Sequence, residues 1–225
     1  MCGGKGTRIK SPNGYKIEKP LLEIKHKPMI EYLMNTIIQT YKFEKIFAAV
    51  SNNTPKTRQF IKDNIQNRIT LLDTSGKEYS EDYLIIIKYF IHTKYKQDID
   101  LGKILFIPVD IPLISSNLLI KIINTHQEKP CLSVILEKEF IQNSGITPTK
   151  YEIELNDKKY CYSGISLIDF SKFDVNDYKI KEIQMIDEEY LILNYTEIAC
   201  NINTSEDLEA VKNIIEILKP RLEDN

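Results

Sequence analysis

Glycine and basic residues gather at the start of the sequence, which reads Gly3-Gly4-Lys5-Gly6-Thr7-Arg8. The chain has eight glycines in all, and so dense a group is typical of backbone that must approach another molecule closely. Inward-pointing backbone N–H groups form a nest for anions, and Lys5 and Arg8 add positive charge. Lys19 supplies a further cation after a short loop. These features predict the binding of a chain of phosphates; the alternative is a basic terminal tail without fixed structure.

This segment fits neither of the two commonest phosphate-binding motifs. It is not a Walker A loop, because no Gly-Lys-Ser/Thr follows at the required spacing, and Gly76-Lys77 also fails since Glu78 follows. It is not a Rossmann fingerprint, because Arg8 stands where that motif has glycine and no acidic residue ends a following strand at the usual distance. A different mode of phosphate binding is indicated.

Polar residues that follow predicted strands form a second candidate group. Asp110 ends the apolar run 106–109, and Asn201 lies at another predicted strand end. Ligands of doubly wound folds bind at this edge, and Mg²⁺ binds through one or two carboxylates plus substrate phosphates. We therefore expect Asp110 and Asn201 to hold Mg²⁺; for each of them, a helix cap or a turn residue is the structural alternative.

Three further segments allow a functional and a structural interpretation. Asp73-Thr74-Ser75-Gly76-Lys77 suits a loop beside a base and a ribose, or an ordinary β-turn. Ser163-Gly164-Ile165 places a glycine within a strand pattern, which indicates either the close approach of another group or a β-bulge. Asp187-Glu188-Glu189 could hold a metal ion, but a solvated charged face is favoured.

Length and composition limit the class of protein. A chain of 225 residues is long enough for one α/β domain with a buried core. A net charge of −2 argues against broad binding to nucleic acid or acidic membranes. The four cysteines form no CxxC pair, which predicts reduced thiols in the cytoplasm and no zinc site or disulfide framework. No apolar run approaches the length of a membrane span, so a soluble protein is expected.

Periodicity predicts alternating helices and strands. The expected helices cover residues 28–41, 56–67, 80–95, 115–125 and a final segment after the capping box Thr204-Ser205-Glu206-Asp207. The expected strands are 45–50, 69–72, 104–109, 131–136 and 197–202, with an antiparallel hairpin of 151–155 and 159–167 around Asn156-Asp157. This order predicts a doubly wound α/β fold, with a mainly parallel sheet flanked by helices. No strand is predicted before the phosphate loop, where a doubly wound fold has its first strand. Either the start site is placed a few residues too late or the chain lacks this strand, and the first explanation is favoured.

Together these segments resemble a known superfamily. Gly3–Arg8, Glu18-Lys19-Pro20-Leu21, Asp110-Ile111-Pro112-Leu113 and residues 201–208 look like nucleotidyltransferases of the GT-A, molybdenum-cofactor-guanylyltransferase-like fold. Narrower similarity, to the archaeal GTP:adenosylcobinamide-phosphate guanylyltransferases of cobalamin synthesis, rests on the segments 51–57, 73–77 with Glu81-Asp82, 163–165 and 182–188. The resemblance spans nearly the whole chain, although a stretch around residues 189–197 is longer than in the family pattern.

The resemblance implies one domain over residues 1–225, with 1–136 binding the nucleotide and 137–225 binding the acceptor and closing the site. Residues implied in catalysis are Gly3, Arg8, Lys19 and Asn201. Residues implied in nucleotide binding are Gly3, Gly4, Lys5, Gly6, Thr7, Arg8, Lys19, Asp73, Thr74, Ser75, Gly76 and Asp110. Ser163 and Gly164 are implied at the acceptor, and Asp110 with Asn201 at Mg²⁺.

The implied reaction moves GMP from GTP onto adenosylcobinamide phosphate and releases pyrophosphate, in a cytoplasmic monomer or homodimer. A phosphate monoester is largely dianionic at neutral pH and needs no general base, which agrees with the absence of a convincing catalytic histidine. Two alternatives stay open: another acceptor (molybdopterin or a sugar phosphate), and a non-catalytic nucleotide-binding domain. A corrinoid needs a wide cleft, whereas a sugar phosphate needs a tight polar pocket.

Overall fold

Alternating apolar strands and amphipathic helices build the structure, which is a computed structural model that describes residues 1–3, 17–65, 68–97, 102–173 and 186–222. The first half contains η1 (Lys19–Leu21), β1 (Glu23–Ile24), β2 (Lys27–Pro28), α1 (Met29–Thr40), β3 (Ile46–Val50), α2 (Pro55–Asn64), β4 (Ile69–Asp73), α3 (Tyr79–Gln97) and β5 (Lys103–Phe106). The second half contains α4 (Ser116–Ile123), β6 (Cys131–Glu137), α5 (Lys138–Asn143), β7 (Glu152–Leu155), β8 (Lys158–Asp169), η2 (Phe170–Lys172), β9 (Glu188–Ile192), α6 (Thr196–Ala199) and α7 (Ser205–Leu222).

The strands form a mixed arrangement. β3 and β4 pair in parallel, and β6 and β9 do the same within a larger sheet of order β5-β8-β6-β9. β8 runs antiparallel to β5 and β6, and β7 joins β8 as the predicted antiparallel hairpin. Asn156 and Asp157 form its turn with φ of 49° and 63°, a conformation that Asn and Asp tolerate. The α/β class and the hairpin are confirmed, but β8 makes the sheet mixed where the sequence predicts mainly parallel pairing.

The first residues lie between the two sheets. The N–H of Cys2 donates to the carbonyl of Ala49 in β3 over 2.9 Å, while the N–H of Val109, beyond β5, donates to the carbonyl of Met1 over 3.3 Å. Within the described residues no strand precedes β1, yet residues 1 and 2 occupy the position between β3 and β5. They place Gly3 at the edge where both of these segments end.

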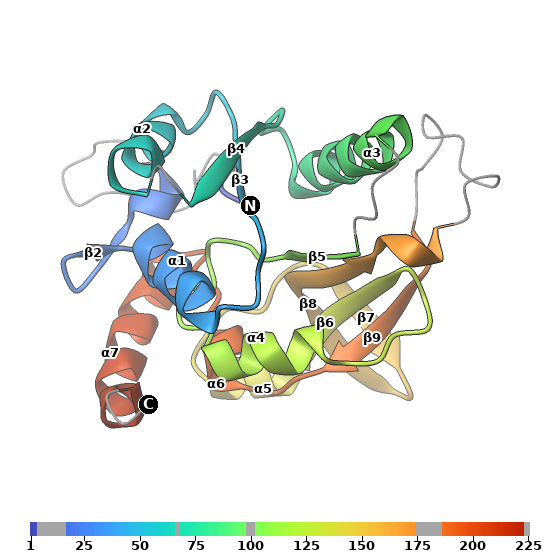
Figure 1. Ribbon diagram of the computed structural model, residues 1–225. Helices are drawn as coiled ribbons and strands as arrows, with labels where there is room; N and C mark the ends of the chain where they lie inside the picture. The colour runs from blue at the N-terminus through green and yellow to red at the C-terminus, as the bar shows by residue number, and fades with distance from the viewer. Residues whose placement is uncertain (4–16, 66–67, 98–101, 174–185, 223–225) are drawn as a thin grey trace.

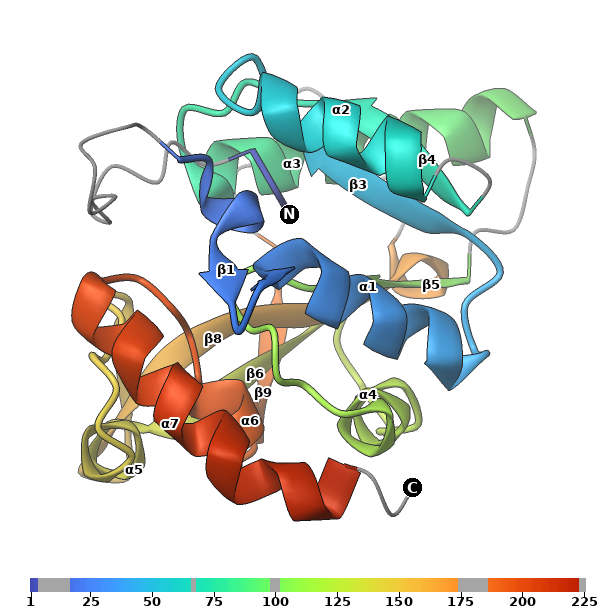
Figure 2. The same ribbon diagram turned by 90° about the vertical axis from the view of Figure 1, so that its left-hand side faces the viewer.

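Helices cover both faces of the sheets (Figures 1 and 2). α3 packs Ile87 and Phe90 against Phe106 of β5 and Ile168 of β8. On the opposite face, α4, α5, α6 and α7 join a larger core with α1. Within the part of the chain that the structure describes, no helix combines the length and the apolar composition needed to cross a bilayer.

The predicted strand at residues 197–202 is wrong. Residues 196–199 form the one-turn helix α6, in which the N–H groups of Ile198 and Ala199 both donate to the carbonyl of Tyr195 over 3.0 Å. Ile198, Cys200 and Ile202 are all buried, so they read as an apolar strand although they pack as a short helix followed by extended chain.

The strand that pairs in parallel with β6 is β9, which lies earlier in the chain than residues 197–202, and the sequence did not predict it. Glu188 and Tyr190 occupy one of its faces, so it lacks a clear apolar pattern. The short helix α5 was also not predicted, and Pro28 stands at the N-cap of α1 instead of in its first turn.

Candidate active site

The segment that carries Lys19 is held by the N-terminus of α2. The Glu18 carboxylate accepts hydrogen bonds from the N–H of Lys56 over 2.8 Å and from the N–H of Thr57 over 2.6 Å, and the Thr57 hydroxyl adds a third over 2.7 Å. Pro55 occupies the first helical turn and has no N–H, so these are N–H groups that the helix itself leaves unpaired. The helix dipole also favours a carboxylate here. Glu18 thereby fixes the backbone from which Lys19 extends.

Lys19 contacts residues from two distant parts of the chain. Its Nζ donates to Oδ2 of Asp110 over 2.6 Å and to Oδ1 of Asn203 over 3.1 Å. The amide of Asn203 in turn donates to Oδ1 of Asn201 over 2.9 Å. The predicted residues Lys19, Asp110 and Asn201 are therefore brought together, with Asn203, which the sequence did not single out, as the link.

The turn before α7 is rigidly capped. Asp207 is 1% exposed, and its carboxylate accepts from the N–H groups of Asn203 and Thr204 over 2.9 and 2.8 Å. The N–H of Asp207 in turn donates to the hydroxyl oxygen of Thr204 over 3.1 Å, as in the predicted capping box. The N–H of Ile202 donates to the carbonyl of Asp110 over 2.9 Å. Asp207 thus positions Asn203, and the backbone of Ile202 ties this turn to the segment that follows β5.

The oxygens at this centre fit a divalent cation. Oδ1 of Asp110 is buried and has no hydrogen-bond partner among the described residues, and an acceptor buried in this way costs about 1–3 kcal/mol unless something satisfies it. Oδ1 of Asn201 accepts one hydrogen bond from Asn203 and has a second lone pair. Within the described ranges, no group of three His, Cys, Asp or Glu side chains is arranged to hold a metal. Two protein oxygens would suit Mg²⁺, which takes its other ligands from water and substrate phosphates.

A second polar region surrounds the loop after β4. Asp82, in the first turn of α3, accepts from the hydroxyl of Ser75 and from the N–H of Gly76, both over 2.9 Å. On the other side, the amide of Asn53 donates to the carbonyl of Gly76 over 2.7 Å. The N–H of Thr74 donates to the carbonyl of Val50 over 2.9 Å. This loop is held from both sides and does not form an isolated β-turn.

Gly3 lies against this loop. Its carbonyl accepts from the Ser51 hydroxyl over 2.8 Å, and a Cβ at position 3 would lie 3.1 Å from Oγ1 of Thr74 and 3.2 Å from Oδ2 of Asp82. The side chain of Asp73, by contrast, is 78% exposed and pairs with Arg58. The structure therefore brings Gly3, Thr74, Ser75 and Gly76 together, and directs the Asp73 carboxylate away from them to the surface.

Gly164 lies in a β-bulge and also approaches another segment. Ser133 pairs with Ser166 and Ile135 pairs with Tyr162, so residues 163–165 stand opposite a single residue of β6. Gly164 has φ of 84°, its carbonyl accepts from the Tyr79 hydroxyl over 2.7 Å, and a Cβ on it would lie 3.1 Å from Pro108. The β-bulge and the close approach of another group, which the sequence offered as alternatives, therefore both occur at Gly164.

The Ser163 side chain is buried and forms its hydrogen bonds within the same bulge. It is 4% exposed, and its hydroxyl donates to the carbonyl of Val134 over 2.8 Å and accepts from the N–H of Ile165 over 3.0 Å. If Gly164 contacts the acceptor substrate, Ser163 would support it indirectly, by maintaining the shape of the bulge.

The acidic run 187–189 has structural partners. Asp187 pairs with Lys129 over 2.9 Å, and Glu189 accepts from the N–H of Glu128 over 2.6 Å. Glu188 accepts from the hydroxyls of Ser133 and Tyr162 over 2.6 and 2.7 Å. Asp187 is exposed, as a solvated charged face requires, whereas Glu188 and Glu189 are half-buried and hold neighbouring segments through hydrogen bonds.

Five of the predicted phosphate-binding residues, Gly4, Lys5, Gly6, Thr7 and Arg8, lie outside the described residues. Several residues that organise the site were not predicted: Glu18, Ser51, Asn53, Asp82, Asn203 and Asp207. All of them act on partners that a local pattern does not reveal, except Asp207, whose place in the capping box marks it as a helix cap.

A curated relative matches this chain over almost its whole length. Adenosylcobinamide-phosphate guanylyltransferase from Methanocaldococcus jannaschii is 29% identical over 233 residues, covering 96% of this chain and 95% of that protein. The predicted resemblance is confirmed. No protein-family model matches the chain.

Solved structures agree at the level of the fold. CMP:2-keto-3-deoxy-manno-octonic acid synthetase complexed with CTP superposes with a TM-score of 0.57 at 11% identity, covering 88% of this chain and 92% of that one. A 4-diphosphocytidyl-2C-methyl-D-erythritol synthase from Anaerococcus prevotii gives 0.58 at 13% identity, covering 89% and 91%. The α/β nucleotidyltransferase fold is therefore confirmed.

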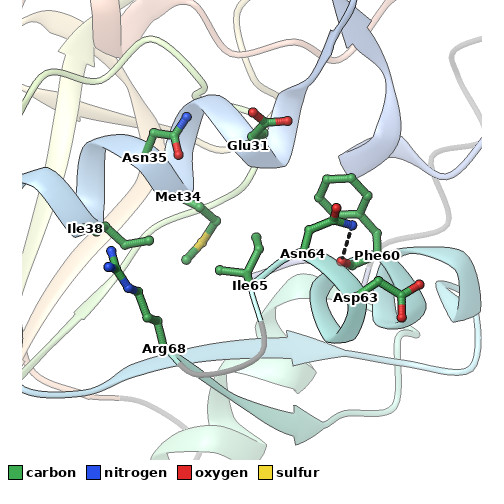
Figure 3. Close-up of a pocket in the computed structure, with 9 residues that line it drawn as sticks. All are labelled: Glu31, Met34, Asn35, Ile38, Phe60, Asp63, Asn64, Ile65 and Arg68. Atoms are coloured by element: carbon green, nitrogen blue, oxygen red, sulfur yellow. Dashed lines mark hydrogen bonds between the residues drawn. The ribbon is translucent and has the colours of Figure 1, made fainter.

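A groove of about 690 Å³ lies apart from the predicted site residues, between α1 and the C-terminal end of α2 (Figure 3). It is lined by Glu31, Met34, Asn35, Ile38, Phe60, Asp63, Asn64, Ile65 and Arg68. None of these residues belongs to the Lys19–Asp110 centre or to the loop after β4. The groove lies at the opposite end of α2 from the end that Glu18 caps.

Replacing Gly76 by alanine is expected to destabilise the fold. Gly76 has φ of 65°, and a Cβ there would lie 2.3 Å from Oγ of Ser51. A non-glycine residue in this backbone region costs about 1–3 kcal/mol even without a clash. Urea unfolding measures the change. Gly145→Ala is the matched control, because Gly145 has φ of 73° with no atom within 4 Å of the added Cβ. Equal losses in the two variants would contradict the close packing of this loop.

Proposed function

We propose that the chain transfers GMP from GTP to adenosylcobinamide phosphate, giving adenosylcobinamide-GDP and pyrophosphate in the assembly of the cobalamin nucleotide loop. The single observation that carries the proposal is the direct contact of Lys19 with Asp110 and Asn203. It is supported by the similarity, over 96% of this chain, to a relative named for this activity.

Lys19 stabilises the charge that develops at the α-phosphorus. Its Nζ is bound to Asp110 and Asn203, and its side chain is 16% exposed, so it is held in place before substrate binds. Because the cation is already in position, little reorganisation is needed during the reaction. Such preorganisation is the main source of electrostatic stabilisation of a transition state. An incoming phosphate competes with Asp110 for Lys19, and this exchange frees the Asp110 carboxylate.

Asp110 and Asn201 are the residues that would hold Mg²⁺. When bound, this ion polarises the α-phosphate and neutralises charge on the departing pyrophosphate. The buried, unpartnered Oδ1 of Asp110 supports this assignment. Asn203 and Asp207 maintain the orientation of Asn201 through their hydrogen bonds.

The acceptor phosphate attacks directly. A phosphate monoester is largely dianionic at neutral pH, so positioning replaces general-base catalysis. The thiols are unsuitable as nucleophiles, because all four cysteines are buried, and burial raises the pKa of Cys200 to about 12 and also raises the pKa of Cys2. The proposed reaction is therefore one in-line displacement by the acceptor phosphate, with no covalent intermediate on a cysteine. The buried, unpaired thiols also support the cytoplasm as the proposed location.

Pyrophosphate release with GTP, Mg²⁺ and adenosylcobinamide phosphate tests the proposal. Release is expected only with the corrinoid present, and not with molybdopterin or a sugar phosphate in its place. Pyrophosphate release with molybdopterin or a sugar phosphate would show that this compound, and not the corrinoid, is the acceptor substrate. If GTP binds but no acceptor stimulates release, the chain is a nucleotide-binding domain and the proposal fails.

Size-exclusion chromatography with light scattering decides between the proposed monomer and homodimer.

A further inference from the structure

Asp82 has one carboxylate oxygen that the protein uses and one that it leaves open. Its side chain lies in the first turn of α3, and the residue is 4% exposed. Oδ1 accepts from Ser75 and Gly76, both over 2.9 Å. Oδ2 has no hydrogen-bond partner among the described residues, yet it is not fully enclosed. A nearly buried carboxylate with one free, reachable oxygen is suited to a ligand that donates hydrogen bonds.

Gly3 keeps this oxygen uncovered. A Cβ at position 3 would lie 3.2 Å from Oδ2 of Asp82 and 3.1 Å from Oγ1 of Thr74. The backbone does not demand glycine here, because Gly3 is not among the residues with positive φ. The requirement is for space: the absence of a side chain leaves Oδ2 of Asp82 uncovered beside Oγ1 of Thr74, whose hydroxyl donates to the carbonyl of Val50 over 3.2 Å.

The charge at Asp82 determines which part of a nucleotide it can meet. A carboxylate repels phosphate oxygens, whereas Lys19 attracts them, so the phosphates belong at the Lys19–Asp110 centre and the base belongs at the loop after β4. Guanine carries two adjacent donors, N1–H and the N2 amino group. Adenine and cytosine place a ring nitrogen acceptor beside their amino group, and this acceptor would face the carboxylate unfavourably.

We propose that Oδ2 of Asp82 accepts hydrogen bonds from the N1–H and N2 amino edge of guanine and makes the site select GTP. Ser75 and Gly76 fix the carboxylate in one orientation through Oδ1, and Asn53 holds the loop from its other side. This inference rests on the proposed function for the identity of the nucleotide. It adds the residue that distinguishes guanine from other bases, a residue to which neither the sequence nor the resemblance gave a role.

Asp82→Asn tests the inference by calorimetric binding of GTP, XTP and ATP without acceptor. Asparagine retains an oxygen for Ser75 and Gly76 but presents an NH₂ group where Oδ2 was. GTP affinity is expected to fall about ten- to hundredfold, as for loss of a hydrogen bond to a charged group. XTP affinity should rise, because xanthine has a carbonyl at C2 that accepts from this NH₂ group. Asp157→Asn, on the exposed β7–β8 turn, is the matched control and should change neither affinity.

The pattern across nucleotides separates reading of the base from a structural role. An inverted preference between GTP and XTP supports the inference. Equal weakening of all three nucleotides, or unchanged affinities, overturns it, because Asp82 would then only hold the loop or do nothing measurable.

Analogues of GTP test the same edge in the wild-type protein, should the variant not fold. ITP lacks the N2 amino group and N1-methyl-GTP lacks N1–H; weaker binding of both supports the inference, and binding equal to GTP overturns it. Selective GTP binding without transfer to the corrinoid would contradict the proposed function while supporting the role of Asp82. Binding of no nucleotide at all would overturn both.

Discussion

Replacing Asp110 by asparagine is expected to lower kcat for guanylyl transfer by about 10²–10³-fold, the range found when one preorganised electrostatic group is removed from an active site. Asparagine preserves the volume and can still accept from Lys19, so the fold should persist. What it loses is the negative charge of the carboxylate whose buried Oδ1 we propose as a ligand of Mg²⁺. Steady-state turnover as a function of Mg²⁺ concentration measures the effect, and Mn²⁺ binding followed by electron paramagnetic resonance reports on the site directly.

Asp187→Asn is the matched control for this experiment. Asp187 also belongs to an acidic segment, but its carboxylate is 66% exposed and pairs with Lys129. It should leave turnover and the Mg²⁺ requirement unchanged. If Asp110→Asn retained wild-type kcat and Mg²⁺ dependence, the placement of the metal at Asp110 would be wrong.

Replacing Lys19 by alanine is expected to lower kcat about tenfold or more while GTP still binds. In the proposed mechanism Lys19 contacts the α-phosphate from a segment that Glu18 fixes to α2, so its loss would remove charge stabilisation at the reacting phosphorus but leave the loop after β4 intact. Stopped-flow or steady-state turnover gives kcat, and calorimetry gives the GTP affinity.

The Lys19 variant also leaves Asp110 without its ion-pair partner, so a thermal melt must show that the protein remains folded. Lys158→Ala is a suitable control, because Lys158 is 61% exposed on the β7–β8 hairpin and bonds only weakly to Glu137, over 3.4 Å. Turnover at the wild-type rate in Lys19→Ala would contradict the assignment of the centre.

The sequence predicted the centre well where function depends on the ends of strands. Asp110 follows an apolar run and Lys19 stands in a recognisable segment, and both signals are local. The fold then brings the two positions together, because η1 carries Lys19 to the segment that follows β5, where its Nζ lies 2.6 Å from Oδ2 of Asp110. Asn201 was predicted at this centre for a wrong reason, since α6 replaces the expected strand. Its hydrogen bond to Asn203 explains why it still reaches the centre.

The residues that escaped prediction depend on contacts between distant parts of the chain. Glu18 caps a helix that begins 37 positions later, and Asp82 is meaningful only because the loop after β4 folds back onto it. β9 was missed because Glu188 and Tyr190 satisfy their polar groups across strands, with Ser133 and Tyr162. Local periodicity carries no information on such partners, so tertiary pairing overrides it.

Transfer of label from GTP to the corrinoid tests the central claim most directly. The protein is incubated with Mg²⁺, adenosylcobinamide phosphate and GTP labelled with ³²P at either the α- or the γ-phosphate, and the products are separated. We predict that the α-label appears in the corrinoid product and that the γ-label appears only in pyrophosphate. A corrinoid that carries the γ-label, or no label while GTP is consumed, would contradict guanylyl transfer by this chain.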